Sequence, residues 1–193
     1  MSGDLARTLD ALRAAQSREP YPSAAARRDR LARVLAIVRE RERDFVAAID
    51  RDFGHRSSHE TRLAELYIVA SEARHAMRAL RRWMKPRRVP TPLQLKPGRA
   101  YVLPQPRGVA GIVSPWNYPV QLALAPAVAA LAAGNRVMLK PSEVAPATSA
   151  LLVEAIASRF AHDEFAVVTG GPETGAAFSR LQFDHLFFTG STA

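Results

Sequence analysis

The sequence contains no cysteine among its 193 residues, so disulfides, thiolate metal sites and a thiol nucleophile are all excluded within it. Long apolar runs are also lacking, because Gln121 and Pro126 interrupt the most hydrophobic stretch, which is short for a membrane span. No secretory signal is visible, since Asp4 and Arg7 precede any apolar segment. The five histidines show no spacing typical of metal ligands. We therefore expect a cytoplasmic chain with no membrane partner and no metal site.

Positive charge is concentrated in the first half of the chain. Residues 1–107 hold 23 Lys and Arg against 12 Asp and Glu, whereas residues 108–193 hold 4 against 6, within a total net charge of +9. A basic region of this kind can bind nucleic acid or an anionic surface. No nucleic-acid-binding motif accompanies the charge, and the favoured interpretation places the arginines on solvated helix faces. We therefore expect no nucleic-acid partner.

Apolar residues at helical spacing predict three helices in the first half of the chain. The first covers about residues 4–16, the second runs from residue 23 to residue 54, and the third covers residues 57–84. Ser57 and Glu60, three residues apart, are typical of a capping box at the start of the third helix. The residues expected to face inward from this helix are Leu63, Leu66, Tyr67, Ala70, Met77 and Leu80.

Short apolar strands alternate with helices in the second half, a pattern that indicates a parallel sheet with helices on its faces. The predicted strands cover residues 100–103, 109–113, 137–139, 165–168 and 186–188. We therefore predict an α/β fold in which N-terminal helices precede a doubly wound, mostly parallel, Rossmann-like sheet. The expected regions are residues 1–85 (helical), 86–108 (extended connector and strand) and 109–193 (dinucleotide-binding).

Polar loops follow two of the buried strands, and ligands of open parallel sheets bind at such strand ends. Residues 114–119 read Ser-Pro-Trp-Asn-Tyr-Pro, and residues 139–143 read Leu-Lys-Pro-Ser-Glu. With Ala-Gly-Asn at residues 133–135 and Phe-Thr-Gly-Ser-Thr at 188–192, these four motifs resemble the aldehyde dehydrogenase superfamily. The helical first half is similar to the branch that includes the class-3, fatty and coniferyl aldehyde dehydrogenases. Residues 52–61 (Asp-Phe-Gly-His-Arg-Ser-Ser-His-Glu-Thr) are similar to the coniferyl group.

The resemblance implies the cofactor-binding portion of an NAD(P)-dependent enzyme that oxidises an aldehyde, of the aromatic, coniferyl type in one reading, to a carboxylic acid. Asn117 would donate to the oxygen that becomes negative, a contribution on the order of 3 kcal/mol to the transition state; a plain helix-capping role is the alternative. Lys140 and Glu143 would hold the adenosine ribose, with NAD preferred over NADP; a surface ion pair is the alternative. The other implied cofactor contacts are Ile112, Ser114, Trp116, Ser142, Gly171, Gly175, Gly190 and Ser191.

The family's chemistry also needs a catalytic cysteine and a glutamate, which the resemblance places beyond Ala193. We therefore expect this chain alone to be inactive, and the longer protein to form a homodimer or a larger oligomer. Two alternatives remain open: a stand-alone nucleotide-binding or regulatory module, and a less favoured basic helical protein that binds nucleic acid. The coding sequence after Ala193 would distinguish a stand-alone module from part of an aldehyde dehydrogenase. Salt-dependent binding of DNA would support the nucleic-acid-binding alternative.

Overall fold

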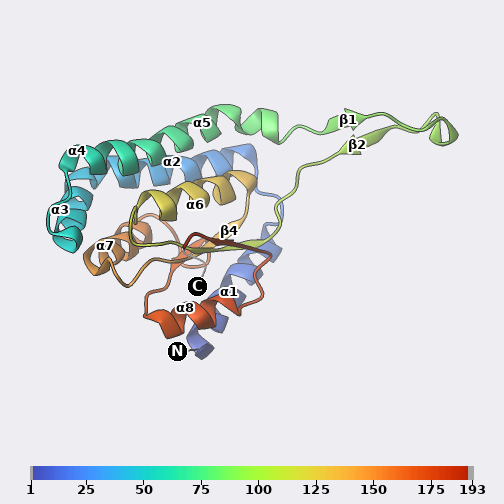
Figure 1. Cartoon of the computed structure of the whole chain (residues 1–193). Coiled ribbons are helices and arrows are strands. Elements are labelled where there is room, and N and C mark those ends of the chain that lie inside the picture. The colour runs from blue at the N-terminus through green and yellow to red at the C-terminus, as the bar shows by residue number, and fades with distance from the viewer. Residues whose placement is uncertain (1, 191–193) are drawn as a thin grey trace.

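Four parallel strands form the central sheet of the computed structural model, which describes residues 2–190 (Figure 1). Their order is β5-β4-β3-β6, with β3 at Val109–Val113, β4 at Arg136–Lys140, β5 at Phe165–Val167 and β6 at His185–Phe188. Val113 pairs with both Lys140 and Phe188, so three strands end at the same edge. The chain passes from β3 to β5 and then returns beside β3. This reversal makes the β3–β6 boundary the topological switch point and confirms the predicted sheet.

Helices cover both faces of the sheet, as the alternating pattern predicts (Figure 1). The elements on the two faces are α6 (Gln121–Ala133) with α7 (Pro146–Ala157), and α8 (Pro172–Ser179) with α1 (Ser2–Arg18). Ile112, Leu139 and Phe165 pack toward α6 and α7, whereas Val109 and Met138 pack toward α1 and α8. Because α6 also lies beneath the N-terminal helices, it is apolar on nearly all sides.

The N-terminal helices form a further layer over α6 (Figure 1). They are α2 (Ala24–Glu40), α3 (Glu42–Phe53), α4 (Ser58–Glu60), the π-helix η1 (Thr61–Tyr67) and α5 (Ile68–Trp83). The prediction of one helix between residues 23 and 54 is wrong, because the helical hydrogen bonding changes at Arg41 while the apolar pattern continues. The ends of this region are confirmed: Ser23 Oγ caps α2, and Gly54 (φ 77°) ends α3. Within residues 2–190, none of the helices combines the length and apolar character needed to span a membrane.

The third predicted helix differs from expectation at its start. Among the described residues, the Ser57 side chain makes no capping bond, and Glu60 instead pairs with Arg56, so the predicted capping box is wrong. The π-helical turn changes the angular spacing of the side chains. Leu63 and Tyr67 consequently point outward, 67% and 55% exposed, which corrects their predicted inward orientation.

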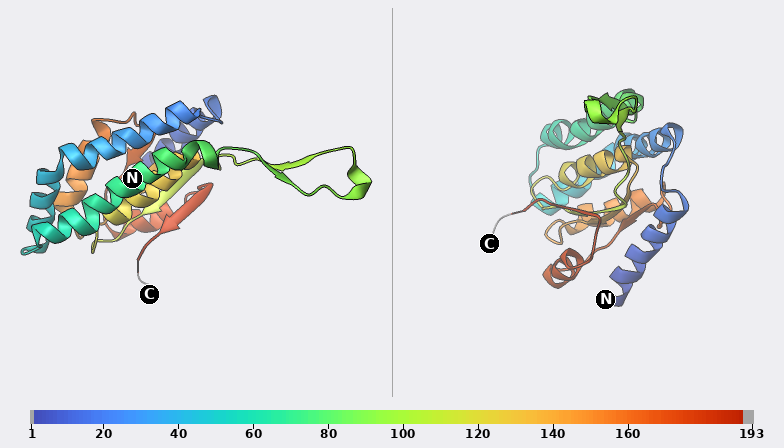
Figure 2. Two further views of the ribbon diagram at one scale, coloured as in Figure 1. Left: turned by 90° about the horizontal axis from the view of Figure 1, so that it is seen from above. Right: turned by 90° about the vertical axis from the view of Figure 1, so that its right-hand side faces the viewer.

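A β-hairpin projects from the body of the molecule (Figures 1 and 2). It consists of β1 (Arg87–Val89) paired antiparallel with β2 (Ala100–Val102), with the 3₁₀ helix η2 (Leu93–Leu95) between them. The sequence predicts the strand at residues 100–103 but shows only an extended connector before it. Strand β1 has only three residues in a proline-rich segment, which are too few to show the two-residue alternation typical of a strand.

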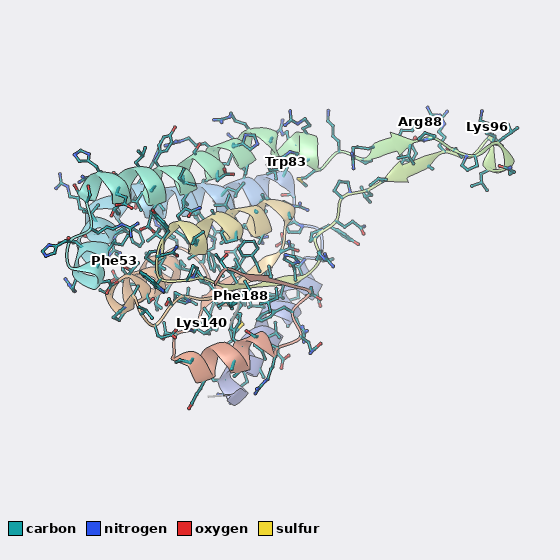
Figure 3. All side chains as sticks on the ribbon, viewed as in Figure 1. Phe53, Trp83, Arg88, Lys96, Lys140 and Phe188 are labelled. Atoms are coloured by element: carbon teal, nitrogen blue, oxygen red, sulfur yellow. The ribbon has the colours of Figure 1, made fainter. Side chains whose placement is uncertain are left out.

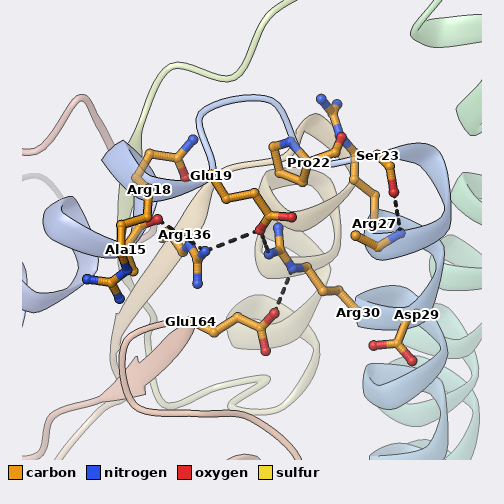
Figure 4. Close-up of polar contacts among 12 residues, drawn as sticks. Ala15, Arg18, Glu19, Pro22, Ser23, Arg27, Asp29, Arg30, Arg136 and Glu164 are labelled. Atoms are coloured by element: carbon orange, nitrogen blue, oxygen red, sulfur yellow. Dashed lines mark hydrogen bonds and ion pairs between the residues drawn. The ribbon is translucent and has the colours of Figure 1, made fainter.

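Buried charges join the amino-terminal edge of the sheet to α2 (Figure 4). Arg30 is 3% exposed, and its guanidinium lies 2.7 Å from a carboxylate oxygen of Glu164 and 2.7 Å from one of Glu19. Arg136, at the start of β4, reaches Glu19 at 3.3 Å. The expectation that the arginines lie on solvated faces is therefore wrong for Arg27 and Arg30, which are buried because backbone or carboxylate oxygens pair with them.

Candidate functional site

A cleft opens at the carboxyl-terminal edge of the sheet, where β3, β4 and β6 end. Its volume of about 520 Å³ lies within the range of small-molecule sites. It occupies the topological switch point, the position where open α/β sheets bind ligands. The structure brings together around it these predicted site residues: Ser114, Trp116, Asn117, Lys140, Ser142, Glu143, Gly175 and Gly190.

Two of the predicted site residues lie outside the cleft lining, and a third is not among the described residues. The Ile112 side chain is buried in the core on the α6 side of the sheet, so it does not line the cleft. Gly171 lies just before α8 and is likewise outside the cleft lining. Ser191 lies outside the described residues.

Lys140 and Glu143 form an ion pair at the end of β4. Although Lys140 is charged, its side chain is only 5% exposed, and it lines the cleft together with Phe188 at the end of β6 (both labelled in Figure 3). The hydrogen bond from Lys140 lowers the pKa of the Glu143 carboxyl, so this group is ionised at neutral pH. A Cβ built at Gly175 would lie 3.9 Å from Lys140 Nζ, which places the start of α8 over the lysine. The pair is therefore half-buried in the cleft and differs from an ordinary solvated surface pair.

The two serines of the cleft have different surroundings. Ser142 is engaged in its turn, because its hydroxyl accepts from Val144 N at 3.2 Å and its carbonyl accepts from Ser149 Oγ at 2.8 Å. Ser114 is 3% exposed, and among residues 2–190 its hydroxyl has no hydrogen-bond partner. A buried polar group without a partner is rare in native structures and calls for an explanation, such as a water molecule or a ligand.

The glycine turn before α8 is constrained at a residue that the sequence did not single out. Gly170 has φ 153°, and a Cβ there would lie 2.1 Å from Thr174 Oγ1. A Cβ at Gly171 would meet nothing within 4 Å. The fold therefore requires glycine at position 170, whereas the space beside Gly171 is open.

Asn117 lies in the loop between β3 and α6, where it is exposed and lines the cleft. The alternative of a helix-capping asparagine is wrong, because α6 begins at Gln121 and its first N–H groups are bound elsewhere. Glu65 Oε2 accepts from Val120 N at 2.7 Å and from Gln121 N at 3.2 Å. The amide of Asn117 is therefore free of the capping role.

Sequence reasoning missed the residues that support this loop from the N-terminal helices. Arg56 donates to the Asn117 carbonyl oxygen at 2.9 Å, and Glu60 accepts from the Tyr118 hydroxyl at 3.1 Å. Glu65 is fully buried, and this burial raises the pKa of its carboxyl. A carboxylate beside the inward-facing Leu66 was the one available signal in the sequence.

No group of three or more histidine, aspartate or glutamate side chains across residues 2–190 is arranged to hold a metal ion. The polar groups of the cleft are instead an amide, hydroxyls, an ammonium and a carboxylate. Such groups suit the hydrogen-bonding surface of an organic ligand.

Comparisons with known proteins agree with the motifs. A sequence model described as the aldehyde dehydrogenase family matches residues 2–193. The chain is 45% identical over 181 residues to a probable coniferyl aldehyde dehydrogenase of Pseudomonas aeruginosa, covering 94% of this chain and 38% of that protein. It is 40% identical over 190 residues to a coniferyl aldehyde dehydrogenase of a Pseudomonas species, covering 98% of this chain and 39% of that protein.

A solved structure of Staphylococcus aureus AldH in a substrate-bound state matches with a TM-score of 0.92 and 30% identity. The match covers 96% of this chain and 40% of that one. The chain thus spans about two fifths of the length of the relatives it matches. The matched family and the predicted resemblance agree: this chain belongs to the aldehyde dehydrogenase family.

Proposed function

We propose that this chain forms the nicotinamide dinucleotide-binding part of an aldehyde dehydrogenase that oxidises an aldehyde to a carboxylic acid. The observation that carries the proposal is the buried Lys140, paired with Glu143, in a cleft at the topological switch point. An ammonium donor and a carboxylate acceptor suit the two hydroxyls of a ribose. The names of the two Pseudomonas relatives favour an aromatic aldehyde of the coniferyl type as substrate.

The helix starts around the cleft support the placement of the cofactor's phosphates. Asp52 caps α7 by accepting from Ala147 N at 2.9 Å and Thr148 N at 2.8 Å, as Glu65 caps α6. Helix α8 differs, because within residues 2–190 no side chain caps its start at Gly171. A helix start without a carboxylate cap can accept an anion. We therefore assign the phosphates to the side of the cleft formed by α8 and Gly190.

The remaining cleft residues have separate roles in this proposal. The unpartnered Ser114 hydroxyl would bind a polar atom of the cofactor, and Trp116 would form an apolar wall. Ser142 would shape the turn that holds Glu143. The nicotinamide, when bound, supplies the acceptor for the hydride that leaves the substrate.

Asn117 would stabilise negative charge on the substrate oxygen. Its amide can donate a hydrogen bond, and one such donor contributes on the order of 3 kcal/mol to a transition state. The chain has no cysteine, so the thiolate that forms the covalent intermediate in this chemistry must come from outside residues 1–193. We expect residues 1–193 alone to form no NADH with an aromatic aldehyde. Turnover above that of an Asn117→Ala variant would contradict this expectation.

Glu143 would also favour NAD over NADP, because its ionised carboxylate repels a 2′-phosphate. Two like charges about 4 Å apart in water interact by about 1 kcal/mol, so Glu143→Gln should narrow the preference about fivefold. The preference is the ratio of the two dissociation constants measured by calorimetry. Glu154→Gln, on the outer surface of α7, is the matched control. If the ratio of the two dissociation constants is unchanged in Glu143→Gln, the carboxylate of Glu143 does not contact the ribose.

The longer protein would assemble as a homodimer or larger oligomer in this proposal. The projecting hairpin exposes the large apolar side chains Leu93, Leu95 and Tyr101 (77%, 64% and 54%). Exposed apolar side chains gathered on one element mark a surface of association. Sedimentation of the longer protein with and without the hairpin would test this part.

Calorimetric titration of the chain with NAD tests the proposed site. Lys140→Met keeps the aliphatic stem but removes the ammonium, and a hydrogen bond to a charged group contributes about 1.5–3 kcal/mol. The dissociation constant should therefore rise roughly tenfold to a hundredfold. Lys96→Met, at the far end of the hairpin in Figure 3, should leave it unchanged. If Lys140→Met binds NAD as tightly as the unaltered chain does, the proposed cofactor site is wrong.

A further inference from the structure

We propose that the segment from Phe53 to Glu65 positions Asn117, and that Arg56 is the positioning residue at its centre. The proposal rests on the proposed role of Asn117 as a donor to the substrate oxygen. Its evidence is separate, because it consists of contacts between the N-terminal helices and the loop that carries Asn117.

Arg56 is held from several sides and directs one donor at Asn117. Its side chain is 11% exposed, and Nη1 donates to the Asn117 carbonyl oxygen at 2.9 Å. The guanidinium lies 4.7 Å from the ring centre of Phe53 and 4.5 Å from that of Tyr118. Glu60 lies 3.1 Å from Nη2. A planar guanidinium can stack on rings and donate in its plane at once, which a lysine ammonium cannot.

The residues on both sides of Asn117 are fixed by the same segment. Trp116 packs against Phe53 with ring centres 6.0 Å apart. The Tyr118 hydroxyl donates to Glu60 at 3.1 Å, so Glu60 binds both Arg56 and Tyr118. Three consecutive residues of the loop therefore contact a segment about sixty positions earlier in the chain.

Glu65 fixes the far end of the loop, where α6 begins. Helix starts are usually capped by a serine, threonine, aspartate or asparagine at the N-cap position. Here the N-cap is Val120, and the carboxylate comes from the π-helix η1 instead. The two hydrogen bonds to Glu65 therefore attach the start of α6 to η1. Among the described residues the second oxygen of Glu65 has no partner, so the buried carboxylate serves this attachment.

The direction of these contacts matters for Asn117. Its backbone carbonyl oxygen accepts from Arg56, in the connector between α3 and α4, and the residue also lines the cleft. A catalytic donor must be held within roughly 0.5 Å of its working position by surrounding groups. The other asparagine, Asn135, is used differently, because its Oδ1 accepts from Arg107 N and Gly108 N at the opposite edge of the sheet.

The sequence offers a direct probe, because it contains only these two asparagines. Selective ¹⁵N-asparagine labelling gives backbone and side-chain amide signals for Asn117 and Asn135 alone. Arg56→Met removes the donor and the charge that interacts with both rings. Arg62→Met is the matched control, because Arg62 lies on the same segment but pairs with the exposed Glu42 at 2.7 Å. The spectra are recorded on residues 1–193 without cofactor or substrate.

We expect Arg56→Met to shift the Asn117 signals several-fold more than those of Asn135, and Arg62→Met to leave both in place. Arg56→Lys, which keeps the charge but not the planar fork, should restore the Asn117 signals only in part. A general loss of stability would weaken the folded signals of both asparagines alike. Unmoved Asn117 signals in a folded Arg56→Met chain, or equal shifts of the two asparagines, would overturn the proposal.

A second variant decides the case in which Arg56→Met does not fold. Glu60→Gln removes the negative charge of the half-exposed side chain that contacts both Arg56 and Tyr118, and so weakens both contacts. It should shift the Asn117 signals less than Arg56→Met would, and it should leave the Asn135 signals in place. Unshifted Asn117 signals would overturn the proposal. Since no nicotinamide is present, these results are independent of the calorimetric test of Lys140, so the two proposals can fail separately.

Discussion

The two edges of the parallel sheet differ in what several of their polar side chains bind. At the amino-terminal edge, side chains bind one another and the starts of the strands: Asp184 accepts from Val109 N at 2.7 Å, and Asn135 accepts from Gly108 N at 3.0 Å. At the carboxyl-terminal edge, Asn117 is exposed to the cleft and, among residues 2–190, the Ser114 hydroxyl is unpartnered. The first arrangement holds the strands together, whereas the second leaves groups available to a ligand.

The buried carboxylates of the two regions show the same contrast. Burial raises the pKa of the Glu164 carboxyl, but the hydrogen bonds and charges of Arg33 and Arg30 outweigh it, and the pKa lies below its ordinary value. Burial also raises the pKa of Glu65, near the carboxyl-terminal edge, and there two backbone N–H groups do not reverse the effect. Glu164 is therefore compensated by arginines, and Glu65 is retained for the attachment of α6.

The largest expected effect is a loss of stability at the amino-terminal edge. Glu164→Gln removes the charge that compensates Arg30 and Arg33, and breaking a buried ion pair costs about 3 kcal/mol. Urea unfolding of residues 1–193 measures the change. Asp4→Asn, which removes a solvent-exposed pair with Arg7, should have a far smaller effect. A Glu164→Gln chain as stable as Asp4→Asn would show that the two edges do not differ in this way.

The second prediction sharpens the contrast by pH. The raised pKa of Glu65 means that its contribution is full below the ordinary value of about 4.3 and is lost as the pH rises through the folded pKa. The lowered pKa of Glu164 means that its contribution is full above about 4.3 and is lost as the pH falls through the folded pKa. We therefore compare the unfolding free energy of each variant with that of the unaltered chain. This difference should be most favourable to Glu65→Gln at neutral pH and most favourable to Glu164→Gln at acidic pH.

Unfolding free energies across this pH range test the opposite slopes directly. A tenfold difference in proton affinity between the folded and unfolded chains corresponds to about 1.4 kcal/mol of stability, so effects of this order are measurable. Slopes of the same sign in Glu65→Gln and Glu164→Gln would contradict the assignment of the two carboxylates.

The smallest expected effect concerns Ser114. Because its hydroxyl is buried and has no partner among the described residues, Ser114→Ala should leave the unfolding free energy unchanged within about 0.5 kcal/mol, or raise it slightly. The same variant should weaken NAD binding, measured by calorimetry. A clear loss of stability would indicate that the hydroxyl serves the fold, and an unchanged affinity would exclude it from the cofactor site.

Much of the fold could be predicted from the sequence, because its signals are local. Continuous apolar strands such as β3 and β4 and the glycine that ends α3 are visible within a few residues. The break at Arg41 and the π-helix are not, because the apolar spacing continues through both. Tertiary contacts decide those features.

The candidate site divides in the same way. Its cleft residues follow strands in recognisable motifs, so Lys140, Glu143 and Asn117 could be selected from the sequence. The supports could not, because Arg56 lies 61 residues from Asn117 and Glu65 lies 55 residues from Val120. Glu164 could not be selected for the same reason, because its partner Arg30 is 134 residues away.

Hydrogen exchange of residues 1–193 with and without NAD tests the central claim, that the carboxyl-terminal edge of the sheet is the binding edge. We expect NAD to slow exchange in residues 113–117, 140–144, 172–175 and 188–190, which surround the cleft. We expect no change at residues 107–110 and 135–136, which lie at the amino-terminal edge. Protection of the amino-terminal edge, or of the hairpin, with an unprotected cleft would contradict this claim.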